Sequence, residues 1–188
     1  GTNCVAIGSG ALYTANENDN DGTIAIGNQA GNVQACTGGA QYAGAQVWIG
    51  HNAGLALTTG IGNIGIGYKA LTQHVDGNRN IAIGYGAMAI TGGTTADGSD
   101  DNIFIGHLAG GGDWADAVSS ENVGVGALVM DGVLSDAMNN STLGHHALTA
   151  LTSGSHNTTM GSYAGDSITS GDNNTLIGRG SDGAAGVD

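Results

Sequence analysis

Residues 63–70 read Asn63-Ile64-Gly65-Ile66-Gly67-Tyr68-Lys69-Ala70, and residues 80–87 repeat the phrase as Asn80-Ile81-Ala82-Ile83-Gly84-Tyr85-Gly86-Ala87. Outward from this pair, related phrases occur along all 188 residues, most often 17 residues apart. Such a fixed period predicts a repeat architecture, so we treat 1–188 as one array and not as several domains. Its ten copies are anchored on Gly8, Gly27, Gly50, Gly67, Gly84, Gly106, Gly126, Gly144, Gly161 and Gly178.

Two aliphatic columns accompany the anchor glycine. The residue before it is always large and aliphatic, and the residue two positions earlier is Val or Ile in the first seven copies. This alternation is typical of a short strand with one apolar face. We therefore predict an all-β fold, a parallel β-solenoid (β-roll or β-helix) of about ten coils. We expect the two aliphatic columns to stack and to fill a narrow interior, with the anchor glycine at a bend where a side chain clashes or φ is positive.

Two further columns flank the predicted strand. An Ala usually stands three residues after the anchor glycine, which would let two backbones approach closely. An Asn precedes most strands, and it would either cap a turn or form a ladder of stacked amides. Each coil offers few large apolar side chains against the entropy of ordering it, so we expect several chains to associate through the small-residue columns.

The charge balance excludes several classes of partner. The net charge is −13, and Lys69, Arg79 and Arg179 are the only permanent cations, so nucleic acids and anionic membranes would be repelled. No apolar stretch approaches the roughly 20 residues that span a bilayer, so we predict no membrane insertion. Cys4 and Cys36 are too few for a disulfide framework, and isolated side chains are the expected state, with their pairing as the alternative.

The pattern Asn-x-x-Ile-Gly-x-x-Ala, with Gly-x-x-Asn leading into a copy as at Gly60 to Asn63, resembles the repeats of bacteriophage tail fibres. It is more distantly similar to the head repeats of trimeric autotransporter adhesins, whose coils are shorter. The resemblance covers Asn3 to about Arg179. It implies a parallel homotrimer on a virion or cell surface that binds a host-surface glycan or an outer-membrane receptor. The repeat length favours the viral fibre; a bacterial surface adhesin and a self-assembling filament subunit are the alternatives.

Candidate binding residues fall in one column and in the insertions. The position after the anchor glycine forms a polar and aromatic stripe that can stack on glycans or on its own neighbours. The longer insertions all fall between the Ala and Asn columns, where loops of a solenoid usually bind partners, although neutral variation is the alternative. We expect Trp114 to be an exposed binding aromatic, whereas Trp48 and Phe104 are expected to pack beneath inserted loops. The ligand-binding candidates are Tyr42, His51, Tyr68, Tyr85, His107 and Trp114, with Asn28 and His145 in the same stripe.

Two acidic clusters have the oxygen density that calcium requires, namely Asp19 with Asp21, and Asp97 with Asp100 and Asp101. Solvated acidic turns are the alternative, and no other cofactor is indicated. A polysaccharide depolymerase would need paired carboxylates at a fixed separation. The possible donors lie in irregular insertions that fix no separation, so we expect no enzymatic activity.

Overall fold

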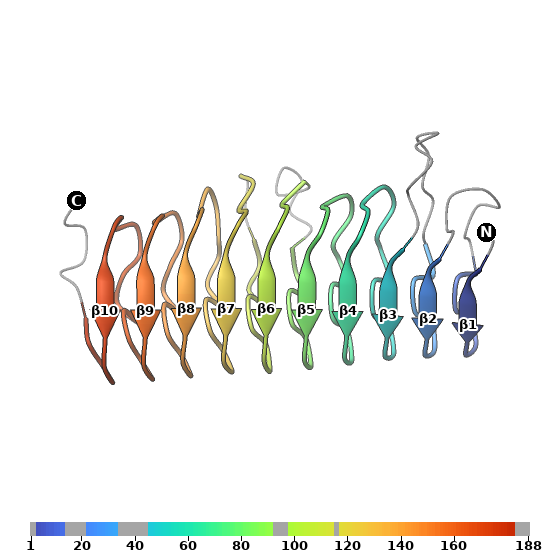
Figure 1. The fold of residues 1–188 in the computed structure, drawn as a ribbon, viewed down its shortest axis with the longest axis horizontal. Coiled ribbons are helices and arrows are strands. Elements are labelled where there is room, and N and C mark those ends of the chain that lie inside the picture. The colour runs from blue at the N-terminus through green and yellow to red at the C-terminus, as the bar shows by residue number, and fades with distance from the viewer. Residues whose placement is uncertain (1–2, 14–21, 34–44, 92–97, 115–116, 183–188) are drawn as a thin grey trace.

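The computed structural model describes residues 3–13, 22–33, 45–91, 98–114 and 117–182. Ten three-residue strands form one parallel sheet in chain order, one strand for each copy of the repeat (Figure 1). No helix occurs in these ranges, so the predicted all-β parallel β-solenoid is confirmed. The strands are β1 (Val5–Ile7), β2 (Ile24–Ile26), β3 (Val47–Ile49), β4 (Ile64–Ile66), β5 (Ile81–Ile83), β6 (Ile103–Ile105), β7 (Val123–Val125), β8 (Ser141–Leu143), β9 (Thr158–Met160) and β10 (Thr175–Ile177).

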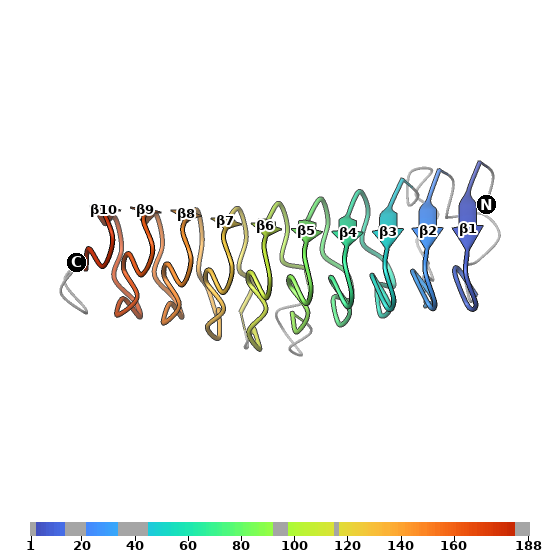
Figure 2. The same ribbon diagram turned by 90° about the horizontal axis from the view of Figure 1, so that it is seen from below.

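Successive strands pair in the same register, which stacks equivalent residues of the repeat directly on one another. Ile66 lies opposite Ile83, and Ile83 lies opposite Ile105. Parallel strands lie about 4.8 Å apart, so the nine steps between ten strands span about 43 Å. The predicted stacking of columns is therefore confirmed, and Figure 2 shows the result as an elongated rod with the sheet along one side.

The predicted interior position of the two aliphatic columns is wrong. In β2 to β9 the middle residue of each strand is buried, while its two neighbours are half-exposed or exposed. Leu143 and Met160, for example, are 48% and 51% exposed. Alternate residues of a strand point to opposite faces, so a small middle residue such as Ala82 faces the interior and the aliphatic pair faces outward.

Other positions fill the coil interior. Leu71, Met88, Met130 and Leu148, each directly after the Ala column or its equivalent, are fully buried with φ between 47° and 52°. Further along the coils, Leu57, Leu134, Leu151 and Ile168 join the same apolar core. The Ala column, from Ala30 to Ala164, is also fully buried. These Ala side chains are buried within the single chain, so this column does not form the predicted contact between chains, while the association of chains itself stays a prediction.

The anchor glycines are required by close packing between coils. At Gly67 φ is +136°, and an added Cβ would overlap the carbonyl oxygen of Gly84 in the next coil. The same overlap recurs at every anchor from Gly8 to Gly161. Both predicted reasons for glycine, a clash and a positive φ, are confirmed.

The Asn column forms an amide ladder through the array. Asn80 Oδ1 accepts hydrogen bonds from the backbone N and the Nδ2 of Asn102, at 3.0 and 3.1 Å. Asn80 Nδ2 in turn donates to the backbone oxygen of Ser99 at 2.8 Å. The pattern runs from Asn63 to Asn174, so each amide both joins its neighbours and holds a turn of the next coil.

Trp48 and Phe104 are fully buried inside the coils, which confirms that they are packing residues. Residues 34–44 and 92–97 of the insertions before them lie outside the described residues, as does Cys36. The predictions that concern the inserted loops and the Cys4–Cys36 pair therefore rest on the sequence alone.

Candidate functional site

A row of four rings follows the turn after the sheet. His51, Tyr68, Tyr85 and His107 stand directly after the anchor glycines of four successive coils. Their centroids are 5.4, 5.0 and 5.4 Å apart, and their planes tilt by 12°, 18° and 25°. The structure thus brings four of the six predicted ligand-binding residues together in one exposed stack.

The stack leaves ring edges open but covers the inner ring faces. Centroids about 5 Å apart are in stacking contact, which leaves no room for another ring between them. Tyr68 and Tyr85 are 39% and 54% exposed, and the Lys69 ammonium lies 5.4 Å from the Tyr68 centroid. The row therefore presents phenol and imidazole edges to solvent, and a sugar can meet a ring face only at an end of the row.

A second ring cluster lies two coils beyond His107. His145 and His146 meet edge to face at 4.2 Å, and His146 stacks on Tyr163 at 5.1 Å with planes 3° apart. His145 was expected in the stripe, but His146 and Tyr163 were missed. They belong to the next column, where φ is positive, and only the turn geometry brings that column beside the stripe.

The predicted exposed aromatic at Trp114 is wrong. Its side chain is fully buried, its Nε1 donates to the Gly110 backbone oxygen at 3.0 Å, and its ring meets Phe104 edge to face at 5.9 Å. The indole fits inside the coil next to its glycines, and its burial removes a large apolar area from water. This gain decides the direction of the side chain, although Trp114 lies in an insertion. The remaining candidate, Tyr42, lies outside the described residues.

The acidic cluster at Asp100 and Asp101 is engaged by cationic and amide groups. Arg79 binds Asp101 through Nε and Nη2, both at 2.7 Å, and these hydrogen bonds lower the pKa of the Asp101 carboxyl. Asp100 Oδ1 accepts from the backbone N of Asn78 at 2.7 Å. Asp19, Asp21 and Asp97 lie outside the described residues. Within the part of the chain that the structure describes, no three His, Cys, Asp or Glu side chains form a group able to hold a metal ion.

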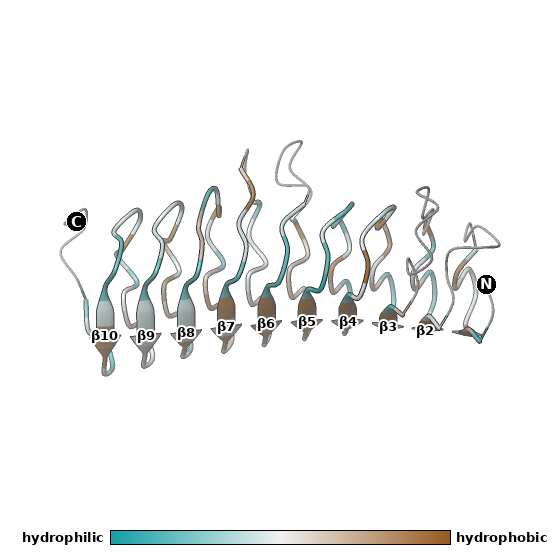
Figure 3. Cartoon of the chain, turned by 45° about the horizontal axis from the view of Figure 1, so that its top comes forward, coloured by the Kyte–Doolittle hydropathy of each residue, from teal (hydrophilic) through white to brown (hydrophobic). Residues whose placement is uncertain are grey.

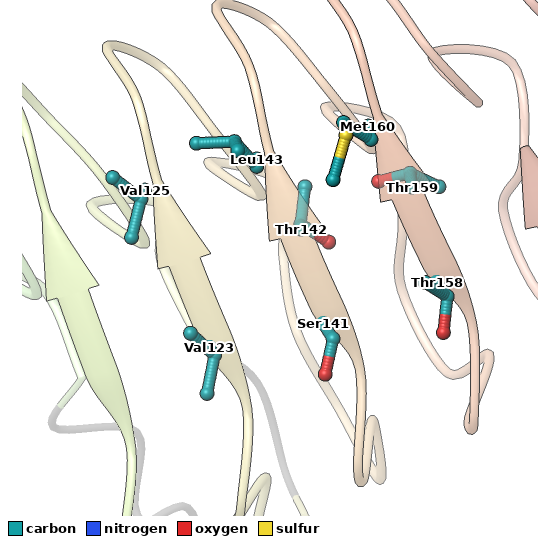
Figure 4. A pocket seen from close by; sticks show the side chains of 8 residues that line it. All are labelled: Val123, Val125, Ser141, Thr142, Leu143, Thr158, Thr159 and Met160. Atoms are coloured by element: carbon teal, nitrogen blue, oxygen red, sulfur yellow. The ribbon is translucent and has the colours of Figure 1, made fainter. Parts of the chain in front are cut away.

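The outward face of the sheet is an exposed apolar surface that sequence reasoning missed. Two columns of Val and Ile run along it from β1 to β7, and Figure 3 shows these strands as hydrophobic and β8 to β10 as paler. Ser141, Thr158 and Thr175 replace the first column in the last three coils. A hollow of about 230 Å³ marks the change (Figure 4), lined by Val123, Val125, Ser141, Thr142, Leu143, Thr158, Thr159 and Met160.

No protein-family model, curated protein or solved structure matches this chain. In the ranges that the structure describes, no helix is long and apolar enough to cross a membrane.

Proposed function

We propose that the chain is a structural and receptor-binding segment of a trimeric viral tail fibre that attaches to a glycan on a host-cell surface. The observation that carries the proposal is the outward apolar sheet face. A single chain leaves both aliphatic columns half-exposed or exposed from β1 to β7, and a fibre of several chains would bury them.

The composition of the face supports a second and third copy of the same chain as its occupants. Among the described residues, the ten strands contain no charged side chain. Copies with a net charge of −13 can therefore approach along this face without placing like charges in contact. A partner must also offer an apolar surface of the same length and coil spacing, which another copy provides. Completing the burial of each half-exposed aliphatic side chain contributes about 1 kcal/mol.

The number of copies rests on the resemblance to the fibre repeats, which implies three around a common axis. The face is three residues wide, so it is narrow compared with its length of about 43 Å. Three narrow faces turned toward one axis would bury both aliphatic columns of each chain. The turns would then point away from the axis, and the ring row would lie on the outside of the fibre.

Receptor attachment is the second part of the proposal. The exposed ring row and the second ring cluster offer polar edges and end faces at regular steps along a rod, which suits an extended carbohydrate chain. The proposed role is binding without catalysis. A filament subunit is the competing proposal, because β1 and β10 each pair with only one other strand of the described array.

Glycan-array binding by the purified segment tests the attachment. We expect saturable binding to one group of surface glycans, with the glycan recovered uncleaved. Release of shorter oligosaccharides would instead identify a depolymerase, and end-to-end polymers in electron micrographs, without glycan binding, would identify a filament subunit.

A further inference from the structure

The ring row is interrupted by one missing side chain. In the coil of β7 the position after the anchor glycine is Ala127, between His107 in the preceding coil and His145 in the next. The backbone ladder of these turns continues unchanged: Leu128 N donates to His107 O at 2.9 Å, and His146 N donates to Ala127 O at 3.0 Å. The interruption is therefore one position without a ring between His107 and His145.

The width of this gap follows from the rest of the row. Each coil step separates ring centroids by 5.0 to 5.4 Å where the row is complete. Two steps place the backbones of His107 and His145 about 10 Å apart. One inserted six-membered ring would lie about 5 Å from the His107 imidazole, within the distance at which ring faces make contact. The His145 ring lies at 81° to His146 and 79° to Tyr163, so it bounds the other side of the gap without continuing the parallel stack. The half-buried Ala127 forms the floor, and both histidines are exposed.

We propose that this gap over Ala127, between His107 and His145, binds one pyranose ring of a surface glycan. The choice of a sugar rests on the proposed attachment to a glycan. It also rests on the chemistry of the two histidines, because the last ring of the row, His107, offers a face for the C–H groups of the sugar, and both imidazoles have nitrogens for its hydroxyl groups. The chain has three permanent cations against 16 acidic residues, which favours a neutral sugar over an anionic one.

The ring cluster behind His145 holds that wall of the gap in place. His145 contacts His146 at 4.2 Å and Tyr163 at 5.6 Å, both edge to face. On the other side, His107 is supported by Tyr85 at 5.4 Å. Both walls are thus fixed before a ligand arrives, so binding orders few side chains.

The test is a titration of the histidine-labelled protein with methyl glucoside, galactoside, mannoside and rhamnoside, observed through the imidazole NMR signals. We expect at least one pyranoside, at millimolar concentration, to shift His107 and His145 while the exposed His156, outside the row, stays unchanged. The Ala127→Tyr variant fills the gap, since Tyr68 and Tyr85 show that the equivalent position of other coils accepts a tyrosine, and it should weaken binding at least tenfold.

The matched control is Ser9→Tyr, which adds a tyrosine to the same column at an exposed position six coils away and should leave the shifts of His107 and His145 intact. Three results would overturn the proposal: no shift with any pyranoside, an undiminished shift in Ala127→Tyr, or a response of the same imidazoles to indole alone, which would assign the gap to an aromatic side chain. None of these removes the trimer or glycan-array binding elsewhere, so the proposed function is tested separately.

Discussion

The Trp48 ring fills the space that a side chain at Gly65 would occupy. The two residues are register partners in β3 and β4, and both point into the coil interior. A Cβ added at Gly65 would lie 2.8 Å from Cε3 of the fully buried Trp48 ring. The same relationship recurs between Phe104 and Gly124 in β6 and β7. The interior thus accepts a large ring only where the next coil has no side chain.

Substituting Gly65→Ala should lower the free energy of unfolding by about 1 to 3 kcal/mol, because it overpacks the space beside Trp48. Urea unfolding measures the change. In a Trp48→Ala background the same substitution should cost little, since Ala opposite Ala is the arrangement that the array already uses at Ala6 and Ala25. Equal costs in both backgrounds would show that the two residues do not share this space.

His74 should make the fold sensitive to acid. It is fully buried, with Nδ1 2.9 Å from Thr91 Oγ1 and Nε2 3.0 Å from Asn80 Nδ2, and burial lowers its pKa from 6.5 to about 4. The unfolded chain therefore takes up this proton at a higher pH than the folded chain. Stability contributed by neutral His74 is complete above pH 6.5 and falls by about 3 kcal/mol as the pH drops to 4.

The measurement is the free energy of unfolding between pH 7.5 and 4 for the wild type and for His74→Gln, since acidic groups also titrate in this range. The difference between the two proteins should shrink toward low pH. The exposed His156→Gln serves as the control and should follow the wild type. If the free energies of unfolding of the wild type and of His74→Gln change with pH in parallel, His74 is not held neutral in the folded chain.

The amide ladder should be the most sensitive polar element of the array. Asn102→Ala removes the acceptor of the Asn122 N–H groups and the donor to Ser119 O. Buried polar groups without partners cost about 1 to 3 kcal/mol each, so we expect a loss of about 3 kcal/mol or more in thermal unfolding. The exposed Asn28→Ala, which loses one hydrogen bond to Ser9 O, should cost under about 1 kcal/mol. Comparable losses would contradict a structural role of the ladder.

The repeat period was sufficient to predict the parallel sheet, the register and the role of the anchor glycines, since all three follow from equivalent residues stacking at equal steps. The direction of the aliphatic side chains was predicted wrongly, because the alternation of residues along a strand is the same whichever face of the strand lies inside. The informative column was the middle one, where Trp48 and Phe104 are each followed by glycine in the next coil. A glycine opposite a large ring is needed where space is limited, in the coil interior, and not on the surface.

The site was predictable only in part for a related reason. Column alignment places His51, Tyr68, Tyr85 and His107 in one row, and the structure confirms the row. His146 and Tyr163 join His145 because a left-handed residue turns the chain, which no period reveals. Trp114 was misplaced because a sequence insertion does not specify whether its side chain points outward or into the coil.

Aspartate on the outward sheet face should separate the copies without unfolding the coils. Ile66 and Ile83 are half-exposed in the single chain, so Ile66→Asp and Ile83→Asp together place charges only in the proposed contact between copies. The circular dichroism spectrum of the double variant should keep its strand signal, while the mass of the assembly in solution falls to that of one chain. Val133→Asp, at a residue 47% exposed outside the sheet, should change neither the strand signal nor the mass of the assembly. Unfolding of the double variant at low temperature would mean that the face belongs to the fold of one chain.

Sedimentation equilibrium of the wild-type segment tests the central claim that the outward aliphatic columns are buried between identical chains. The account predicts a single species of three times the chain mass of 18.3 kDa, unchanged on dilution through the micromolar range. A stable monomer of 18.3 kDa, with both columns open to water, would contradict it.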